Sequence, residues 1–336
     1  MQDATIAFVL TGAASSNLGP LTQNQPKALV RFGGAFRIFD FALSNLLNSK
    51  LRRIYILPLD GDARIGAYVR EGWAQLSKEF RWDRGEDLAC LEPERNIVAQ
   101  ALSMIEASRA ENVLIVSGEQ VYQMDYGQLL SHHIDSHADV TTSVPGVLVF
   151  RHEAIVQLLR KGSGFPPLGR TGRRTSFNVS GYWRDIQNVD DYFAANMDLL
   201  ARRLDFDPYF NRDWPTRTLT GTSLLQENRY ATNSRVSLGA RIAPCTITNS
   251  VVSPGVRIEN GAVVENCVIL SGSQVGPGAR VRNAVIAENV TIPRDAEVGH
   301  GEHQLTVVAD SDPARRQYIQ RRCARVGAVG QRAASR

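Results

Sequence analysis

Apolar runs alternate with helix-like apolar spacing in the first part of the chain, up to residue 205. Short continuous apolar runs predict buried strands at residues 6–10, 53–57, 112–116 and 146–150. Apolar residues three and four apart predict helices at residues 40–48, 97–105, 126–137 and 189–203. Strands that alternate with helices are typical of βαβ units. We therefore expect a mostly parallel sheet with a ligand site beyond the carboxyl ends of its strands.

The second part of the chain has a different hydrophobic period. Residues suited to tight turns, such as Gly239, Gly255 and Asn289, follow several aliphatic residues three positions later. An α-helix and an ordinary half-buried strand both lack this period, whereas a parallel β-helix with short flat faces has it. We predict a β-helix that acts as a scaffold or as an interface between subunits. The aliphatic residues recur every five or six positions: Val236, Ile242, Ile247, Val252, Ile258, Val264, Ile269, Val275, Val281, Ile286, Ile292 and Val298.

These two periods place the domain boundaries. We expect an α/β sheet domain at residues 1–205, a linker at 206–230, a β-helix at 231–305 and a basic C-terminal segment at 306–336. The chain of 336 residues, with 43% hydrophobic and 21% charged residues, is suited to packed domains rather than to disorder.

Charge and cysteine content narrow the class of protein further. A formal net charge of +4 is too small to indicate nucleic-acid binding, and no stretch of the sequence is apolar enough to span a membrane. Asp3 lies where a signal peptide would have basic residues, and the four cysteines lack metal-binding spacing. We expect a cytoplasmic protein with reduced thiols and with neither a nucleic acid nor a membrane as partner.

Several segments together resemble one enzyme family. They are LTGAASSNLGPLT at 10–22, PKALVRFGGAFRIFDFALSNLLNSKLRRI at 26–54, VREGW at 69–73, VSGEQVYQMDY at 116–126, YWRDIQNVDDYFAANMDLL at 182–200 and NRDWPTRT at 211–218. With the hexapeptide period, they resemble the ADP-glucose pyrophosphorylase (glucose-1-phosphate adenylyltransferase) family. The resemblance implies a Rossmann-like (GT-A-like) nucleotidyltransferase domain, a left-handed parallel β-helix and a tetramer. It also implies Mg²⁺-dependent adenylyl transfer from ATP to glucose 1-phosphate for glycogen or starch synthesis. Residues 314–318 resemble the closing helix of the family, so a helix and a basic tail are expected at 306–336.

The loop after the first predicted strand departs from the family pattern. The family has Gly-Gly-x-Gly-x-Arg there, whereas this chain has Gly12-Ala13-Ala14-Ser15-Ser16-Asn17. Asn17 replaces the catalytic arginine, and a neutral amide cannot balance the charge of pyrophosphate. Loss of one preorganised donor typically costs about 3–4 kcal/mol of transition-state stabilisation. The resemblance leaves Gly12 and Gly146 as substrate-binding positions.

The metal site is partly retained. The resemblance places two Mg²⁺-binding carboxylates at Glu119, where the family has aspartate, and at Asp185. Glutamate can bind Mg²⁺, but its longer side chain shifts the metal. Alternatively, Asp185 caps the helix predicted at 189–203.

The substrate contacts implied by the family are largely missing. Residues 93–97 replace the Gly-Thr-Ala-Asp-Ala segment, and Leu59 replaces the glutamine that contacts adenine. Residues 140–146 are too few to include the Glu-Lys-Pro segment, and residues 162–175 contain no Phe-Gly-Lys-Asp segment. Departures on both substrates favour a lost active site over a changed specificity.

Cationic residues outside the catalytic site match the family pattern better than the catalytic residues do. Lys27 aligns with a lysine that binds a phosphorylated activator, and Arg37, Arg280 and Arg282 align near the same effector site. Alternatively, Lys27 is an ordinary solvated surface lysine.

His133 and His137 are four residues apart, but no third metal ligand is evident, so a solvated helix face is expected there.

Three hypotheses follow. The first is a non-catalytic, regulatory subunit that forms a homo- or hetero-oligomer with catalytic pyrophosphorylase subunits and responds to a sugar-phosphate effector. The second is an active adenylyltransferase or related nucleotidyltransferase with an altered site and Mg²⁺. The third is a freestanding sensor of a nucleotide or sugar phosphate.

Overall fold

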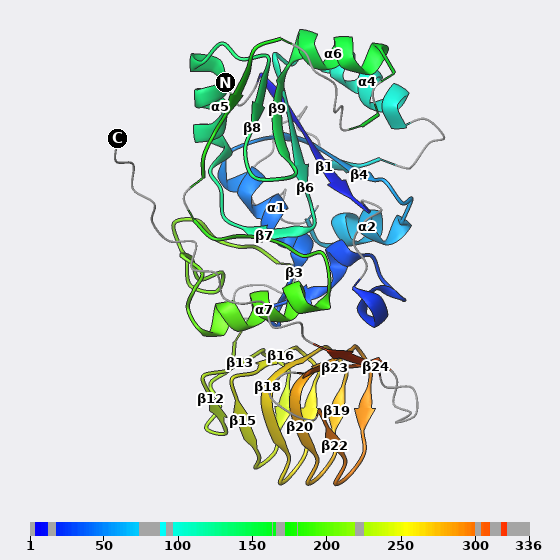
Figure 1. The fold of residues 1–336 in the computed structure, drawn as a ribbon, viewed down its shortest axis with the longest axis vertical. Helices are drawn as coiled ribbons and strands as arrows, with labels where there is room; N and C mark the ends of the chain where they lie inside the picture. Colours follow the sequence, from blue (N-terminus) through cyan, green and yellow to red (C-terminus); the bar gives the residue numbers. More distant parts are fainter. Residues whose placement is uncertain are drawn as a thin grey trace.

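The computed structural model describes residues 4–12, 18–73, 88–91, 97–162, 164–165, 172–179, 181–218, 225–299, 304–309 and 317–320. Within these residues the chain forms a sheet domain followed by a stack of short parallel strands (Figure 1). No helix in this described part is both long and apolar enough to cross a lipid bilayer.

A seven-stranded mixed sheet forms the centre of the first domain, with strand order β10-β8-β9-β6-β1-β4-β5. Strand β1 pairs in parallel with β4 on one side and with β6 on the other, and β9 runs antiparallel to both β6 and β8. The predicted strands and the mostly parallel arrangement are confirmed. The strands are β1 (Thr5–Thr11), β4 (Arg53–Pro58), β5 (Leu88–Cys90), β6 (Asn112–Ser117), β8 (Val140–Thr142), β9 (Val147–Arg151) and β10 (Arg174–Ser176).

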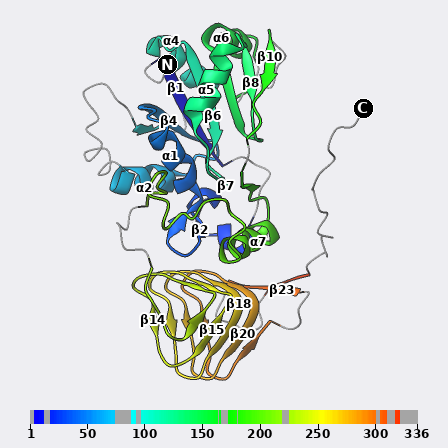
Figure 2. The same ribbon diagram turned by 90° about the vertical axis from the view of Figure 1, so that its left-hand side faces the viewer.

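Helices cover both faces of this sheet because the central strands are apolar on both sides. In β1, Ile6, Phe8 and Leu10 pack in the cluster that includes α4 and α6, whereas Ala7 and Val9 pack in the cluster that includes α1, α2 and α5. Figure 2 shows these layers from the side. The helices are α1 (Ile38–Asn48), α2 (Ala63–Tyr68), α4 (Ile97–Ser108), α5 (Tyr126–Asp135) and α6 (His152–Arg160).

Smaller elements connect the sheet to the second domain. A ribbon of β7 (Gln120–Tyr122) and β11 (Trp183–Asp185) and a hairpin of β2 (Arg31–Phe32) and β3 (Phe36–Arg37) lie beside the main sheet. Helix α7 (Val189–Leu200) lies between the sheet domain and the stacked strands (Figure 1).

The second domain is the predicted parallel β-helix. Corresponding strands of successive coils pair in register, as where Arg241, Arg257, Gln274 and Thr291 lie above one another. Eleven of the twelve predicted aliphatic residues are buried in its interior, and Ile242 is half-buried. Its strands are β12 (Ala231–Thr232), β13 (Arg235–Val236), β14 (Arg241–Ile242), β15 (Thr246–Thr248), β16 (Val251–Val252), β17 (Arg257–Ile258), β18 (Val263–Ile269), β19 (Gln274–Val275), β20 (Arg280–Ile286), β21 (Thr291–Ile292), β22 (Glu297–Val298) and β23 (Gln304–Val308).

A row of asparagines forms one corner of the β-helix. Asn233, Asn249, Asn266 and Asn283 have φ angles of 47°, 48°, 52° and 45°, in the left-handed region that asparagine tolerates better than most residues. The side-chain amide of Asn233 donates to Oδ1 of Asn249 at 2.6 Å. The chain can therefore turn at the same place in each coil without glycine.

One hydrophobic cluster spans both domains. Phe32, Phe36 and Tyr192 of the first domain belong to the same buried cluster as the interior of the β-helix. The C-terminal segment differs from the prediction, because residues 304–308 and 317–320 form the antiparallel strands β23 and β24 (Gln317–Gln320) rather than a helix. Strand β23 pairs with β20 and so extends its sheet by one strand. The free N–H and C=O groups on the outer edge of β23 then favour pairing with a further strand, which is β24.

Candidate functional site

The strand order places the candidate site at the carboxyl end of β1. The chain crosses from β1 to β4 on one side, and β6 returns to the other side, so the carboxyl ends of β1 and β6 lie at a topological switch point. Gly12 directly follows β1, and Gly118 and Glu119 directly follow β6. The structure therefore brings together Gly12, the first residue of the predicted phosphate loop, and Glu119, the first predicted metal ligand.

Both oxygens of the Glu119 carboxylate have partners from the protein. Oε1 accepts a hydrogen bond from the backbone N–H of Gly12 at 2.8 Å, and Oε2 lies 3.0 Å from Nζ of Lys27. Nζ of Lys27 also donates to the backbone carbonyl of Ile186 at 2.9 Å. The side chains of Lys27 and Glu119 are 5% and 4% exposed, so this ion pair is shielded from solvent.

A second carboxylate approaches the same loop. A Cβ atom built on Gly12, whose φ is +74°, would lie only 2.4 Å from Cγ of Asp60. Gly12 thus lies between the carboxylates of Asp60 and Glu119. A cradle for phosphate needs exposed N–H groups and positive potential, whereas the first residue of this loop faces two negative groups.

Asp185 reaches the same end of the sheet from the β7–β11 ribbon. In the ribbon, Asp185 is paired with Gln120, the residue after Glu119. Oδ2 of Asp185 accepts a hydrogen bond from Nε2 of Gln187 at 2.9 Å. The alternative that Asp185 caps the following helix is wrong, because the N-cap of α7 is Asn188, whose side chain accepts from the N–H of Asp191.

These residues do not fit a Mg²⁺ ion. Mg²⁺ is bound by one or two carboxylates together with water and phosphate oxygens, but both Glu119 oxygens are engaged by Gly12 and Lys27, and the Lys27 ammonium competes with any other cation for this carboxylate. Among the residues that the structure describes, no three His, Cys, Asp or Glu side chains are grouped in a way that would hold a metal ion.

Gly146, the other predicted substrate position, permits close packing. Its φ is +82°, and a Cβ atom there would lie 2.9 Å from Cβ of Ser117 and 3.1 Å from Nε2 of Gln120. Gln120 donates to the carbonyl of Pro145 at 2.8 Å and accepts from Nε1 of Trp183 at 3.2 Å. Because Gly146 has no side chain, the amide of Gln120 can lie close to its backbone.

The predicted effector residues lie in different environments. Lys27 is 6% exposed, so it is neither a solvated surface lysine nor available at the surface for an effector. Arg280 and Arg282 lie on exposed positions of β20, and Nε of Arg282 is 3.3 Å from Oε2 of Glu265. Their role in effector binding remains a prediction.

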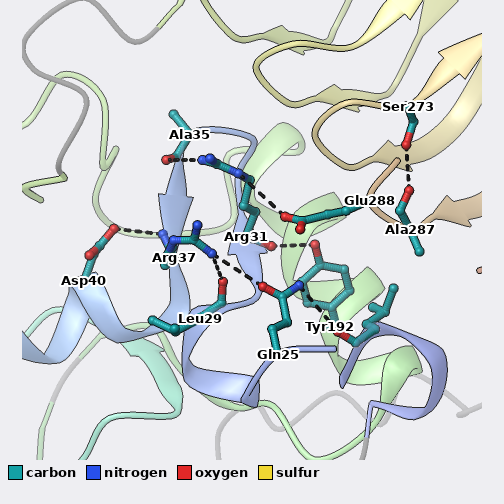
Figure 3. Close-up of polar contacts among 11 residues, drawn as sticks. Gln25, Leu29, Arg31, Ala35, Arg37, Asp40, Tyr192, Ser273, Ala287 and Glu288 are labelled. Atoms are coloured by element: carbon teal, nitrogen blue, oxygen red, sulfur yellow. Dashed lines mark hydrogen bonds and ion pairs between the residues drawn. The ribbon is translucent and has the colours of Figure 1, made fainter. Parts of the chain in front are cut away.

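Arg37 belongs to a polar cluster at the domain boundary (Figure 3). Its guanidinium donates to the carbonyl of Leu29 and to Oε1 of Gln25, and it lies 5.1 Å from the centre of the Tyr68 ring. Burial raises the pKa of the neighbouring Asp40 carboxyl to about 6, although the N–H of Arg37 and the hydroxyl of Tyr68 both donate to it.

Arg31 connects this cluster to the β-helix. Its Nη1 donates to the carbonyl of Ala35 at 3.2 Å, and its Nε lies 3.9 Å from Oε1 of Glu288, between β20 and β21 (Figure 3). Burial and then the nearby Arg37 lower the pKa of Arg31. This link between the domains was not predicted from the sequence.

Other predicted residues lie outside the described part of the chain. They are Asn17, most of the segment 93–97 and residues 166–171. His133 also differs from expectation, because it is only 1% exposed, with Nδ1 2.6 Å from Oγ1 of Thr141, whereas His137 is exposed as expected.

Comparison with known proteins agrees with this architecture. Residues 6–154 match the family model described as nucleotidyl transferase, and residues 216–306 match the model described as GlmU-like, C-terminal hexapeptide. The glucose-1-phosphate adenylyltransferase of Streptomyces coelicolor is 30% identical over 349 residues, covering 77% of this chain and 84% of that protein. This chain belongs to the glucose-1-phosphate adenylyltransferase family.

More distant members of this family align over a similar length. The enzyme of that name from Koribacter versatilis is 27% identical, covering 80% of this chain and 83% of its own length. The one from Yersinia pseudotuberculosis is 25% identical, with 80% and 82% covered. The predicted family and fold class are confirmed, and the chain is an ADP-glucose pyrophosphorylase-like protein.

Asp60 is the main site residue that the sequence interpretation missed. It lies two positions after the end of β4, at the same edge of the sheet as Gly12 and Glu119. The rule that parallel strands bring their carboxyl ends together could have identified it, because residues 53–57 were predicted as a strand.

Proposed function

We propose that this family member is a non-catalytic, regulatory subunit that assembles with active glucose-1-phosphate adenylyltransferase subunits. The observation that carries the proposal is the position of Gly12 between the carboxylates of Asp60 and Glu119. The first backbone donor of the loop that would bind the triphosphate of ATP is therefore already bonded to Glu119, and the exposed carboxylate of Asp60 lies on its other side.

The exposed carboxylate of Asp60 opposes the binding of a triphosphate. One unit charge at about 4 Å from another contributes about 1 kcal/mol in water and about 4 kcal/mol near a protein surface, and the exposure of Asp60 places its effect toward the lower value. Lys27 offsets Glu119, whereas Asp60 is exposed and forms no direct ion pair among the described residues, so the more distant Arg64 offsets its charge only in part. Its repulsion acts together with the neutral Asn17 in the sequence position of the catalytic arginine.

Regulation would then require a path from the sheet domain to its neighbours. The shared hydrophobic cluster and the Arg31–Glu288 contact join the β-helix to the first domain. We propose that a sugar-phosphate effector acts on the assembled cytoplasmic oligomer at the boundary between the two domains, near Arg31. Its contact there would be Arg37 rather than the buried Lys27.

A pyrophosphate-release assay with ATP, glucose 1-phosphate and Mg²⁺ tests the proposal. We expect no turnover by the protein alone and a changed activator response when it is mixed with a catalytic relative from the same cell. Turnover by the protein alone in the usual range of about 1–10³ per second would refute it. So would a mixture whose activator response equals that of the catalytic protein alone.

A charge-neutralising variant sharpens the assay. We expect Asp60→Asn to increase the affinity for ATP, measured by equilibrium binding, because it removes one negative charge beside Gly12. Asp213→Asn, at an exposed position in the segment after α7, is a matched control with the same change of net charge. Equal ATP affinity in both variants and the wild type would argue against the electrostatic explanation.

A further inference from the structure

A polar cavity lies at the end of the β7–β11 ribbon that is farther from Glu119. Glu119 precedes β7, whereas the cavity begins at Gln123, directly after β7 ends. Its volume is about 410 Å³, within the range of small-molecule sites. It is therefore separate from the carboxyl ends of β1 and β6.

Aromatic side chains form the apolar part of this cavity. Phe177, Phe206 and Trp214 line it. Nε1 of Trp214 donates to Oδ1 of Asn45 on α1 at 3.0 Å, and its backbone N–H donates to Oδ1 of Asn211. These two bonds hold the indole in place, so the surface that it offers is preorganised.

Polar groups of both kinds line the same cavity. Oε1 of Gln123 accepts from Nδ2 of Asn211 at 3.0 Å, which orients the Gln123 amide and leaves its NH₂ group to donate. Oδ1 of Asp205 accepts from the N–H of Tyr182 at 3.0 Å, which leaves Oδ2 as an acceptor. Asn178 is exposed, and its amide has no hydrogen-bond partner among the described residues.

The charge of the cavity restricts its ligand. The described residues that line it include the carboxylates of Asp125 and Asp205 and no lysine, arginine or histidine. A phosphate ester would meet negative charge with no cation to balance it. A neutral ligand with several hydroxyl groups fits better, since each hydroxyl can donate to a carboxylate and accept from an amide.

We propose that this cavity binds a neutral saccharide, with a C–H face of the sugar ring against Phe177 or Trp214 and its hydroxyls on Gln123, Asn178 and Asp205. An aromatic surface together with carboxylate and amide groups is complementary to the two faces of a pyranose ring. The proposal does not depend on whether the protein is catalytic, because no residue of the switch-point site lines the cavity.

Isothermal titration with glucose, maltose and maltoheptaose, alongside glucose 1-phosphate, tests this site in the full-length protein. We expect saturable binding of at least one neutral sugar and weaker binding of glucose 1-phosphate. Tighter binding of maltoheptaose than of glucose would identify a glucan chain as the source, and equal or weaker binding would identify a free sugar. No saturable binding of any neutral sugar, or tighter binding of glucose 1-phosphate than of every neutral sugar, would overturn the proposal.

Two variants locate the binding. Asn178→Ala should weaken the affinity for the neutral sugar about tenfold, the effect of one hydrogen bond of about 1.4 kcal/mol. Gln23→Ala, at an exposed position outside the cavity, should leave the affinity unchanged. Asn178 is exposed, so its replacement should keep the melting temperature of the wild type. Equal affinities in Asn178→Ala and Gln23→Ala would place the sugar elsewhere and refute the assignment.

Discussion

The buried ion pair between Lys27 and Glu119 gives the sharpest test of the structure. Lys27→Met keeps most of the side-chain volume but removes the cation that lies 3.0 Å from the Glu119 carboxylate, whose side chain is 4% exposed. Removal of one partner leaves the other charge buried and unpaired, which typically costs about 3–5 kcal/mol. The hydrogen bond to the Ile186 carbonyl is lost as well, so we expect a destabilisation in the upper part of that range.

A double-mutant cycle separates the pair from its surroundings. Lys27→Met, Glu119→Leu and the double variant would be compared by urea unfolding followed by tryptophan fluorescence and circular dichroism. We expect the double variant to be more stable than Lys27→Met, because it leaves no buried charge unpaired. The coupling between the two substitutions should be about 2 kcal/mol or more.

The matched control for this cycle is Lys161→Met. Lys161 is exposed at the C-cap of α6, and its replacement should change the free energy of unfolding by less than about 0.5 kcal/mol. The reasoning would be refuted if Lys27→Met and Lys161→Met unfolded at the same urea concentration. Strict additivity of Lys27→Met and Glu119→Leu would also refute it, since it would mean that the two side chains do not interact.

Three further predictions concern stability. Burial raises the pKa of Asp40 to about 6, so the folded protein takes up a proton at a higher pH than the unfolded chain does. Between pH 7 and pH 4, the free energy of unfolding of the wild type should therefore rise by up to about 3 kcal/mol relative to that of Asp40→Asn. A pH-independent difference between the two proteins in urea unfolding would contradict this. Burial lowers the pKa of His133 to about 4, so this imidazole is protonated at a higher pH in the unfolded chain than in the folded protein. The stability of the wild type should therefore fall as the pH decreases from 6.5 to 4. In thermal unfolding, His133→Gln should show a smaller fall than the wild type. Asn188→Ala should lower the free energy of unfolding by about 1 kcal/mol, because it removes the cap of α7, whereas Asp185→Ala should lower it by less. A lower melting temperature for Asp185→Ala than for Asn188→Ala would indicate that Asp185 is the cap.

Local patterns were enough to predict most of the fold. The strand predicted at 112–116 is β6, and the helix predicted at 40–48 is α1, because burial on both faces of a strand and on one face of a helix leaves a period in the sequence. The same holds for the β-helix, where each coil repeats the same contacts. Residues 317–320 were predicted as part of a helix and form a strand instead, since the open edge of β23 supplied backbone partners that no local pattern records.

The candidate site was predicted only in part. The positions of Gly12, Glu119 and Asp185 followed from the family resemblance and from the carboxyl-end rule. Their partners did not, because contacts such as the bond between Gly12 and Glu119, 107 positions apart, depend on how the strands are ordered in the sheet. The adjacency of Asp60 to Gly12 and the burial of Lys27 depend on that order too.

The sequence by itself determined the two hydrophobic periods, the family and the loss of the motif residues around Asn17. Only the tertiary structure decided that Lys27 neutralises Glu119 in the interior and that Gln123, Asp205 and Trp214 meet around one cavity. The physical reason is the range of the interactions. Hydrophobic periodicity and capping tendencies act between residues close along the chain, whereas a buried charge is stabilised by whichever group the fold places within about 3–4 Å of it.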